Sequence, residues 1–459
     1  MPHKIYNRLA LVLALGLIVW STLAYGAVHQ PIIASIYLGI VCLVIVWIFD
    51  GLRAGFRYVR DPIQLPIYFL AFYALIQTIE FGKLSDGFGF SEIARTISLD
   101  PFSTKVAALH LLALGLYFSI LLVLFDGEKR LRTFALFTGI FGFAYAFFAI
   151  LQSVLSPTKI YGIYESVFAE PFGSFVSRNN FAAWISLAVA IPLGLLFAGG
   201  LKREKLLLYV TAIGLMGVSL LLSGSRGGLV AFAVEILVLI LIAYSPKDRR
   251  SLKVKIAFAI LLAAVIGAGA FFVGGETSLT RIANERGVTD TTTSRSYIWG
   301  VTLRIIADSF PFGIGLGAFP QAYARFDANS GTARVEQAHN DFLELIANAG
   351  LPGLIFGLWF LARFLKLSRS AIDRTEGFQR GLAAGATAGI VGCLVHSFFD
   401  FALHTTAIAL LFLALVAVVV TLANLPQMGD DAHPASGKAL TRTFRRKRRI
   451  NPVPAVHRS

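Results

Sequence analysis

The chain has 459 residues, of which 56% are hydrophobic and only 15% charged, and its mean hydropathy is +0.72. A soluble domain carries about 25% charged residues, so a water-soluble fold cannot cover this much apolar surface. The net charge of +15 does not indicate nucleic-acid binding, because the basic residues are dispersed along the whole chain. Composition therefore predicts an all-α integral membrane protein.

Apolar runs recur almost from end to end, each long enough to cross a hydrocarbon core of about 30 Å. We predict about twelve spans within one membrane domain, residues 1–424. The spans are Leu9–Tyr25, Pro31–Phe49, Pro62–Ile79, Lys105–Phe125, Thr133–Leu155, Asn179–Gly199, Leu206–Leu222, Leu229–Tyr244, Ile256–Gly274, Phe342–Leu361, Gly381–Phe399 and Leu403–Asn424. Lys4 and Arg8 before the first span and Ala24–Ala27 after it are also compatible with a cleavable signal peptide.

Basic residues mark one side of the membrane. Most of the 41 Lys and Arg residues fall in the N-terminus, the C-terminal tail and every second connection, for example Arg53, Arg57 and Arg60. By the positive-inside rule these segments, and both termini, are predicted to be cytoplasmic. Residues 425–459 are predicted to be a disordered basic tail, whose final cluster Arg445–Arg449 suits anionic lipid headgroups.

The outward connections are longer and richer in unusual residues. The longest, residues 275–341, is predicted to be partly helical, because Ser294–Ser309 carries apolar residues at helical spacing behind Thr293 or Ser294 as an N-cap. The apolar positions are Ile298, Val301, Ile305 and Ile306. A loop of this length is usually functional when it is ordered.

A first candidate for chemistry is the tight connection Ser223–Gly228, in which small residues surround Arg226. Such a turn exposes backbone N–H groups to a phosphate, and the guanidinium adds a planar bidentate donor. The alternative is a plain turn whose arginine extends to the membrane surface.

Two further candidates lie in the long loop. Arg295 opens the predicted helix, with Trp299 one turn later and Arg304 beyond; Arg295 and Trp299 could also form only a local cation-π pair. His339, within Gln337–Asp341, precedes the next span and could transfer a proton or merely anchor the chain at the interface.

Other polar residues at this face are better explained by helix capping than by a glycan site. They are Arg178, Asn179 and Asn180 before the sixth span and His396, Asp400 and His404 around the last outer turn. The run Gly313–Gly317 lacks the context of a nucleotide-binding fingerprint and is interpreted as a flexible turn. Glu235 stands alone inside a span, where a hydrogen-bonded carboxylic acid is favoured over a proton relay.

In this order and spacing, the motifs resemble the O-antigen ligase and polymerase family of bacterial membrane glycosyltransferases. The resemblance covers about residues 173–404, roughly half the chain. It depends on Ser225–Gly227, Ser294–Arg295 with Trp299, Pro311–Gly317, His339–Asn340 and Gly350–Gly353.

The resemblance implies a fold like that of the C class of membrane glycosyltransferases, with a large periplasmic loop. It also implies an inverting transfer, without metal or cofactor, from an undecaprenyl diphosphate-linked glycan to an acceptor hydroxyl at the periplasmic face of the bacterial inner membrane. Arg226 and Arg295 correspond to residues thought to bind the diphosphate, and His339 to an essential histidine. We add, as candidates for substrate binding, Arg178, Asn180, Arg304, Asn340, Asp400 and His404.

Elementary chemistry agrees with this assignment, because diphosphate leaves as a stable anion. Its displacement needs charge neutralisation and a base for the incoming hydroxyl, which two arginines and a histidine can supply. The acceptor is lipid A core for a ligase and another lipid-linked glycan for a polymerase, and we favour the ligase. A transporter of lipid-linked glycan, with Glu235 as coupling residue, is the alternative from another class.

Overall fold

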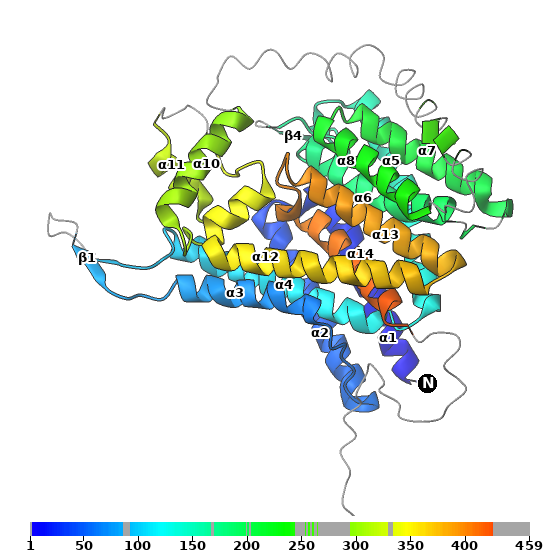
Figure 1. Cartoon of the computed structure of the whole chain (residues 1–459), viewed down its shortest axis with the longest axis horizontal. Coiled ribbons are helices and arrows are strands. Elements are labelled where there is room, and N and C mark those ends of the chain that lie inside the picture. Colours follow the sequence, from blue (N-terminus) through cyan, green and yellow to red (C-terminus); the bar gives the residue numbers. More distant parts are fainter. Residues whose placement is uncertain are drawn as a thin grey trace, which may run out of the picture.

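The computed structural model describes residues 2–85, 92–166, 169–198, 200–201, 203–243, 294–328 and 334–425, with positions 253, 256–257, 259–260 and 264. Over these residues the protein is almost entirely helical (Figure 1), which confirms the all-α membrane fold. In chain order the elements are α1 (Pro2–Leu23), η1 (Tyr25–Ala27), α2 (Gln30–Ala54), η2 (Pro62–Gln64), α3 (Leu65–Gln77), β1 (Lys83–Ser85), β2 (Glu92–Ala94), α4 (Pro101–Leu124), α5 (Glu128–Leu155), β3 (Lys159–Ile160), β4 (Tyr164–Glu165), α6 (Arg178–Phe197), η3 (Arg203–Lys205), α7 (Leu206–Leu222), α8 (Arg226–Ala243), α10 (Arg295–Ser309), α11 (Phe319–Phe326), α12 (Asp341–Arg374), α13 (Gly377–His396), η5 (Ala402–His404) and α14 (Thr406–Ala423).

Ten helices among the described residues are long and apolar enough to cross a membrane, and Pro62–Gln77 is a shorter apolar segment. Each coincides with a predicted span. The ninth predicted span, Ile256–Gly274, lies almost wholly outside the described residues. The total of twelve therefore stays a prediction.

Helices α6 and α14 form the centre of the bundle, since 94% of the apolar window of each is buried, whereas only 17% of that of α2 is. Small residues bring α13 against α6. A Cβ on Gly385 would lie 2.4 Å from the backbone oxygen of Ala190, and one on Gly194 would lie 2.3 Å from the backbone nitrogen of Gly385. Glycines are needed here because the two backbones approach directly, as is common between membrane helices.

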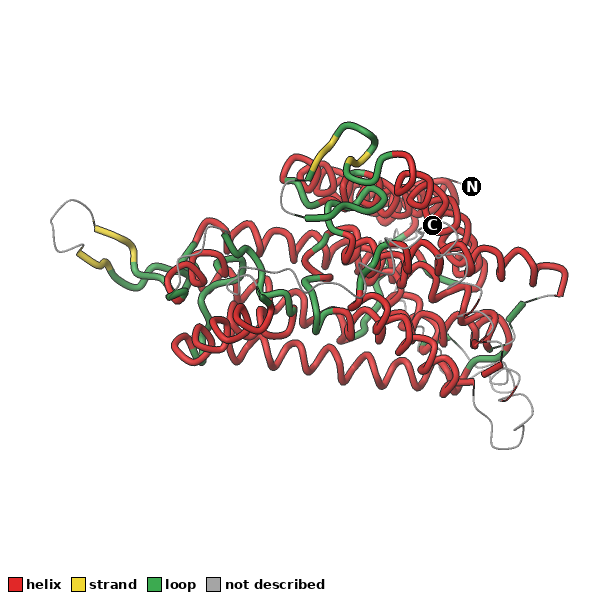
Figure 2. The backbone as a smooth tube through the Cα atoms, turned by 90° about the horizontal axis from the view of Figure 1, so that it is seen from above, coloured by secondary structure: helices red, strands yellow, loops and turns green. Residues whose placement is uncertain are grey.

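The elements between the spans gather mainly at one end of the bundle. In Figure 1 the antiparallel hairpin β1–β2 projects at the left end, and helices α10 and α11 lie at the same end, above α12. The view from above in Figure 2 shows the same hairpin extending away from the helices. The predicted loop helix is confirmed as α10: Ser294 is its N-cap, accepting from the backbone N–H of Tyr297, and Ile298, Val301 and Ile305 are buried.

The glycine run that follows α10 is packed rather than flexible, which corrects the sequence-based interpretation. Helix α12 breaks at Gly350, where φ is +57°. The run supplies partners to the interrupted helix: the N–H groups of Ile314 and Gly315 donate to the carbonyls of Ala347 and Asn348, and that of Leu351 donates to Pro311. Backbone groups freed by a helix break must find partners in a membrane protein, so this contact satisfies them.

Close packing and one buried glutamine fix this junction. A Cβ on Gly350 would lie 2.1 Å from the backbone oxygen of Pro311. From α3, the Gln77 amide donates to the carbonyls of Phe312 (3.0 Å) and Asn348 (2.9 Å) and accepts from the N–H of Leu316. The end of α10 is thereby attached firmly to the membrane helices, which positions its first residue, Arg295.

Candidate functional site

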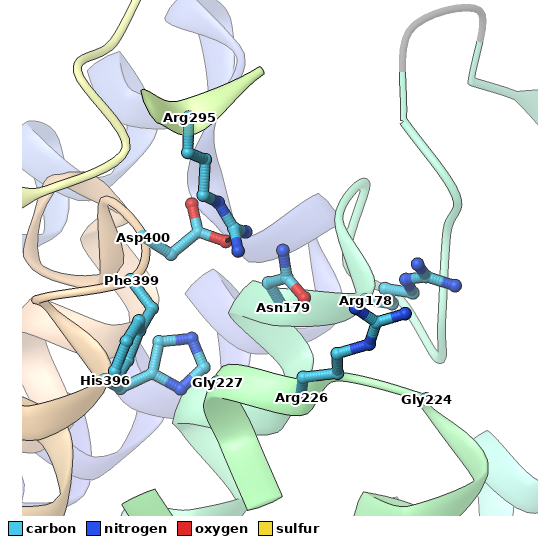
Figure 3. A pocket seen from close by; sticks show the side chains of 9 residues that line it. All are labelled: Arg178, Asn179, Gly224, Arg226, Gly227, Arg295, His396, Phe399 and Asp400. Atoms are coloured by element: carbon cyan, nitrogen blue, oxygen red, sulfur yellow. Dashed lines mark ion pairs between the residues drawn. The ribbon is translucent and has the colours of Figure 1, made fainter. Parts of the chain in front are cut away.

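Three arginines that begin three different helices line one pocket at this end of the bundle (Figure 3). Arg178 begins α6, Arg226 begins α8 and Arg295 begins α10. The pocket is open to solvent and has a volume of about 330 Å³, solvent included, and its other lining residues are Asn179, Gly224, Gly227, His396, Phe399 and Asp400. Because the N-terminus of a helix carries partial positive charge and spare N–H groups, three such ends and three guanidinium groups create a site for an anion.

The connection Ser223–Gly228 is built to place Arg226 at the pocket. Gly224 adopts the left-handed conformation (φ +66°), and the Ser225 hydroxyl accepts from the N–H of Gly228, which caps the start of α8. A Cβ on Gly228 would lie 2.6 Å from that of Ala182 on α6, so only glycine lets the two helices meet here. The turn thus orients Arg226 by capping and by close packing together.

The other two arginines are held by carboxylates. Arg178 forms an ion pair with Glu170 of the preceding loop. The Nη2 of Arg295 lies 3.5 Å from Oδ2 of Asp400, whose side chain is only 2% exposed. The Arg295 side chain therefore lies against the turn between α13 and α14 instead of extending freely into solvent.

Asp400 also contacts His339, and so joins the histidine to the arginine. The Nδ1 of His339 lies 3.1 Å from Oδ1 of Asp400, which also accepts from the N–H of Phe401. Burial would raise the pKa of Asp400, but the hydrogen bond with His339 and nearby positive charge, including that of Arg295, outweigh burial and hold it below the usual 3.8. An ionised Asp400 makes Nδ1 of His339 the proton donor in this bond.

The backbone of His339 is left-handed, with φ of +50°, an uncommon conformation for a residue with a side chain. Neighbouring bonds hold it there. The Asn340 side chain caps α12 by accepting from the N–H groups of Phe342 and Leu343, and the N–H of Asp341 donates to the carbonyl of Ser397. Backbone strain of this kind costs about 1–3 kcal/mol and is concentrated at functional sites.

A second histidine, His404, fastens the same segment from the other side. Its Nδ1 lies 2.8 Å from Oδ1 of Asp341 and its Nε2 lies 3.2 Å from Oε1 of Glu344. The other Glu344 oxygen accepts from the N–H of Ala338, next to His339. Burial would lower the pKa of His404, but the Glu344 and Asp341 carboxylates outweigh it and raise that pKa well above 6.5. His404 is thus a charged clamp across the start of α12.

The sequence-based candidates divide into those at the pocket and those away from it. Arg178, Arg226, Arg295 and Asp400 line it, and His339 reaches it through Asp400 without lining it. Asn180 is buried against the bundle, Arg304 lies further along α10 with its charge near Tyr323, and Asn340 is used as a helix cap.

Sequence reasoning overlooked two contributions. Phe399 lines the pocket, and the carboxylates Asp341 and Glu344 hold His404. The sequence contains a signal for Asp341 and Glu344, because two acidic residues three positions apart in the first turn of a helix lie on the same face. Within the described part of the chain, no group of three or more His, Cys, Asp or Glu residues is placed to hold a metal ion.

Glu235 accepts from the Ser186 hydroxyl at 2.8 Å, between α8 and α6. This is the contact expected of a hydrogen-bonded side chain that joins two helices. It lies on the helix that begins at Arg226, about two and a half turns from that end.

Taken together, the site combines a pocket lined by three arginines with a histidine whose Nδ1–H is held by a carboxylate. Residues 211–358 match the family model described as O-Antigen ligase. The matched segment contains Arg226, Arg295 and His339, and leaves Asp400 outside. A comparison of the chain with curated proteins gave no match.

Proposed function

We propose that this chain, which belongs to the O-antigen ligase family through residues 211–358, transfers a glycan from an undecaprenyl diphosphate carrier to an acceptor hydroxyl. Membership makes it a membrane glycosyltransferase of the O-antigen ligase and polymerase type. The carrier, the acceptor and the location of the site at the periplasmic face of the inner membrane are parts of the proposal. The positive-inside bias supports that location, because the connections that bear the site are the less basic ones.

The observation that carries the proposal is the convergence of Arg178, Arg226 and Arg295 on one pocket beside the Asp400–His339 pair. A diphosphate bears negative charge on several oxygens, and guanidinium groups bind such oxygens in bidentate fashion. The helix N-termini add fixed dipoles of the same sign. A pocket for a leaving anion next to a base is the minimum that glycosyl transfer from a diphosphate requires.

In the proposed reaction the acceptor oxygen attacks the anomeric carbon of the donor glycan. The bond between that carbon and the diphosphate oxygen breaks, and the electron pair leaves with the diphosphate, where Arg226 and Arg295 neutralise it. The acceptor proton passes to Nε2 of His339, because Nδ1 keeps its own proton in the bond to Asp400. Attack from the face opposite the leaving group inverts the anomeric configuration.

The test is reconstitution of the purified protein with polyprenyl diphosphate glycan and a panel of acceptors. Arg226→Ala should weaken donor binding, whereas His339→Ala should abolish joining of glycan to acceptor but leave donor binding near that of the wild type. Arg325→Ala, an exposed arginine on α11, serves as the matched control. Full turnover by both Arg226→Ala and His339→Ala would refute the assigned roles.

Lipid A core is the acceptor that we propose, and the same panel contains lipid-linked glycan. Product formed only with the second acceptor would make the protein a polymerase. Movement of donor between leaflets with no joined product would make it a transporter.

A further inference from the structure

His396, the last residue of α13, has a buried imidazole whose two ring nitrogens lack a partner in the described part of the chain. The residue is only 1% exposed, and neither Nδ1 nor Nε2 has a hydrogen-bond partner among the described residues. Burying a polar group in this state costs about 1–3 kcal/mol. A buried histidine without a partner is explained if a ligand, which the free protein lacks, accepts its hydrogen bond.

The ring is directed to the arginine-lined pocket. His396 is one of its lining residues, and Figure 3 shows the imidazole on the Asp400 side, with Arg226 on the side of Asn179 and Arg178. A Cβ on Gly227 would lie 3.9 Å from both Cε1 and Nε2 of His396. Gly227, at the start of α8, therefore lies next to the ring edge with no side chain between them.

The charged groups around the imidazole ring determine which kind of ligand atom can accept its hydrogen bond. Arg295 and the carboxylates of Asp400 and Asp341 act on His396 electrostatically. Oδ1 of Asp400 accepts from His339, and Oδ2 makes only the 3.5 Å ion pair with Arg295, so neither oxygen is bonded to His396. Because no described residue accepts from the imidazole N–H, we assign the acceptor to the ligand, and in a pocket lined by three arginines that acceptor is an anionic oxygen.

We infer that His396 binds the donor, by donating a hydrogen bond from its imidazole to an oxygen of the diphosphate on the opposite side from Arg226. This inference rests on the proposed function and adds a residue that lies outside the matched segment 211–358. His396 makes no covalent bond and takes no proton from the acceptor. It holds the diphosphate between α13 and the start of α8.

The experiment measures binding of farnesyl diphosphate, a short-chain polyprenyl diphosphate, to the purified full chain in detergent. His396→Leu removes the donor at similar volume, His396→Gln keeps an N–H donor, and His29→Leu alters a histidine at the same end of the bundle that packs on Tyr25 and Tyr164 instead. We expect His396→Leu to bind about 10- to 100-fold more weakly than the wild type. His396→Gln should recover most of the affinity, and His29→Leu should bind as the wild type does.

The thermal unfolding midpoint without ligand separates binding from structure. Because leucine removes an unsatisfied buried polar group, His396→Leu should unfold at the same temperature as the wild type or higher. Wild-type affinity in His396→Leu, or equal losses of affinity and stability in both His396 variants, would overturn the inference while leaving glycan transfer by the wild type intact. If the wild type does not bind the probe, and Arg226→Ala makes no difference to the measured binding, the proposed function fails as well.

Discussion

Replacing Asp400 with asparagine removes one negative charge from the site while keeping the size of the side chain. In the wild type this carboxylate is 2% exposed and contacts both His339 and Arg295. The asparagine amide can accept from Nδ1–H of His339 or donate to Nδ1, and the second arrangement moves the ring proton to Nε2. His339 would then be unable to accept the acceptor proton.

The size of the effect follows from the two contacts. The 3.1 Å bond from His339 is partly buried and charge-assisted, and bonds to charged groups contribute about 1.5–3 kcal/mol, or about a 10- to 150-fold change in rate. The Arg295 side chain is 42% exposed, so solvent screens its pair with Asp400 to about 0–1 kcal/mol. Asp400→Asn should therefore lower kcat about 10- to 150-fold and change KM for the donor less than about fivefold.

Steady-state turnover of lipid-linked donor by reconstituted protein is the assay, with Asp308→Asn as control. Asp308 is an exposed carboxylate on α10, and its amide variant should retain wild-type kcat and KM. Thermal unfolding of each variant confirms that the fold is kept. Wild-type kcat in a folded Asp400→Asn protein would refute the role of Asp400 in holding His339.

Three further predictions concern the scaffold. Glu235→Gln keeps a group that can accept from Ser186, so glycan transfer and the unfolding midpoint should both stay near wild type; loss of transfer in a folded variant would instead support a proton-relay role. Gly385→Ala places a methyl 2.4 Å from the Ala190 oxygen and should lower the free energy of unfolding by about 1–3 kcal/mol, measured by thermal or denaturant unfolding; an unchanged value would contradict direct contact of α6 and α13. His404 has a raised pKa, so its clamp stabilises the fold fully below pH 6.5 and less as pH rises through the folded-state pKa. The unfolding midpoint should fall as pH rises through that pKa, and His404→Gln should remove this component; an identical pH dependence in both proteins would contradict the clamp.

Local signals in the sequence predicted the helices correctly and singled out Arg226 and Arg295, which line one pocket in the structure. Ser294 before an apolar period of helical spacing predicts α10 because capping and burial are both local properties. One signal went unused: Ser177–Arg178, Ser225–Arg226 and Ser294–Arg295 each put a capping serine before an arginine that faces the pocket. The repeated pair indicates three similar helix starts, although it does not say that they meet.

The contacts that complete the site are long-range and could not be read from one sequence. Asp400 and His339 are 61 positions apart, and their pairing depends on how the turn after α13 packs on the start of α12. The left-handed conformation of His339 likewise depends on bonds made by Glu344 and His404. The glycine run 313–317 was misread because dense glycine fits both a flexible turn and a close backbone contact, and only the partner at Gly350 distinguishes them.

The most direct test of the proposed function is the product balance of one reaction catalysed by the purified wild-type protein. Lipid vesicles containing the protein, a polyprenyl diphosphate glycan and lipid A core are followed for released carrier and for glycan joined to the acceptor. We expect one molecule of polyprenyl diphosphate released for each glycan joined, with inverted anomeric configuration in the product. Carrier release without joined glycan, or a product of retained configuration, would contradict the proposed transfer.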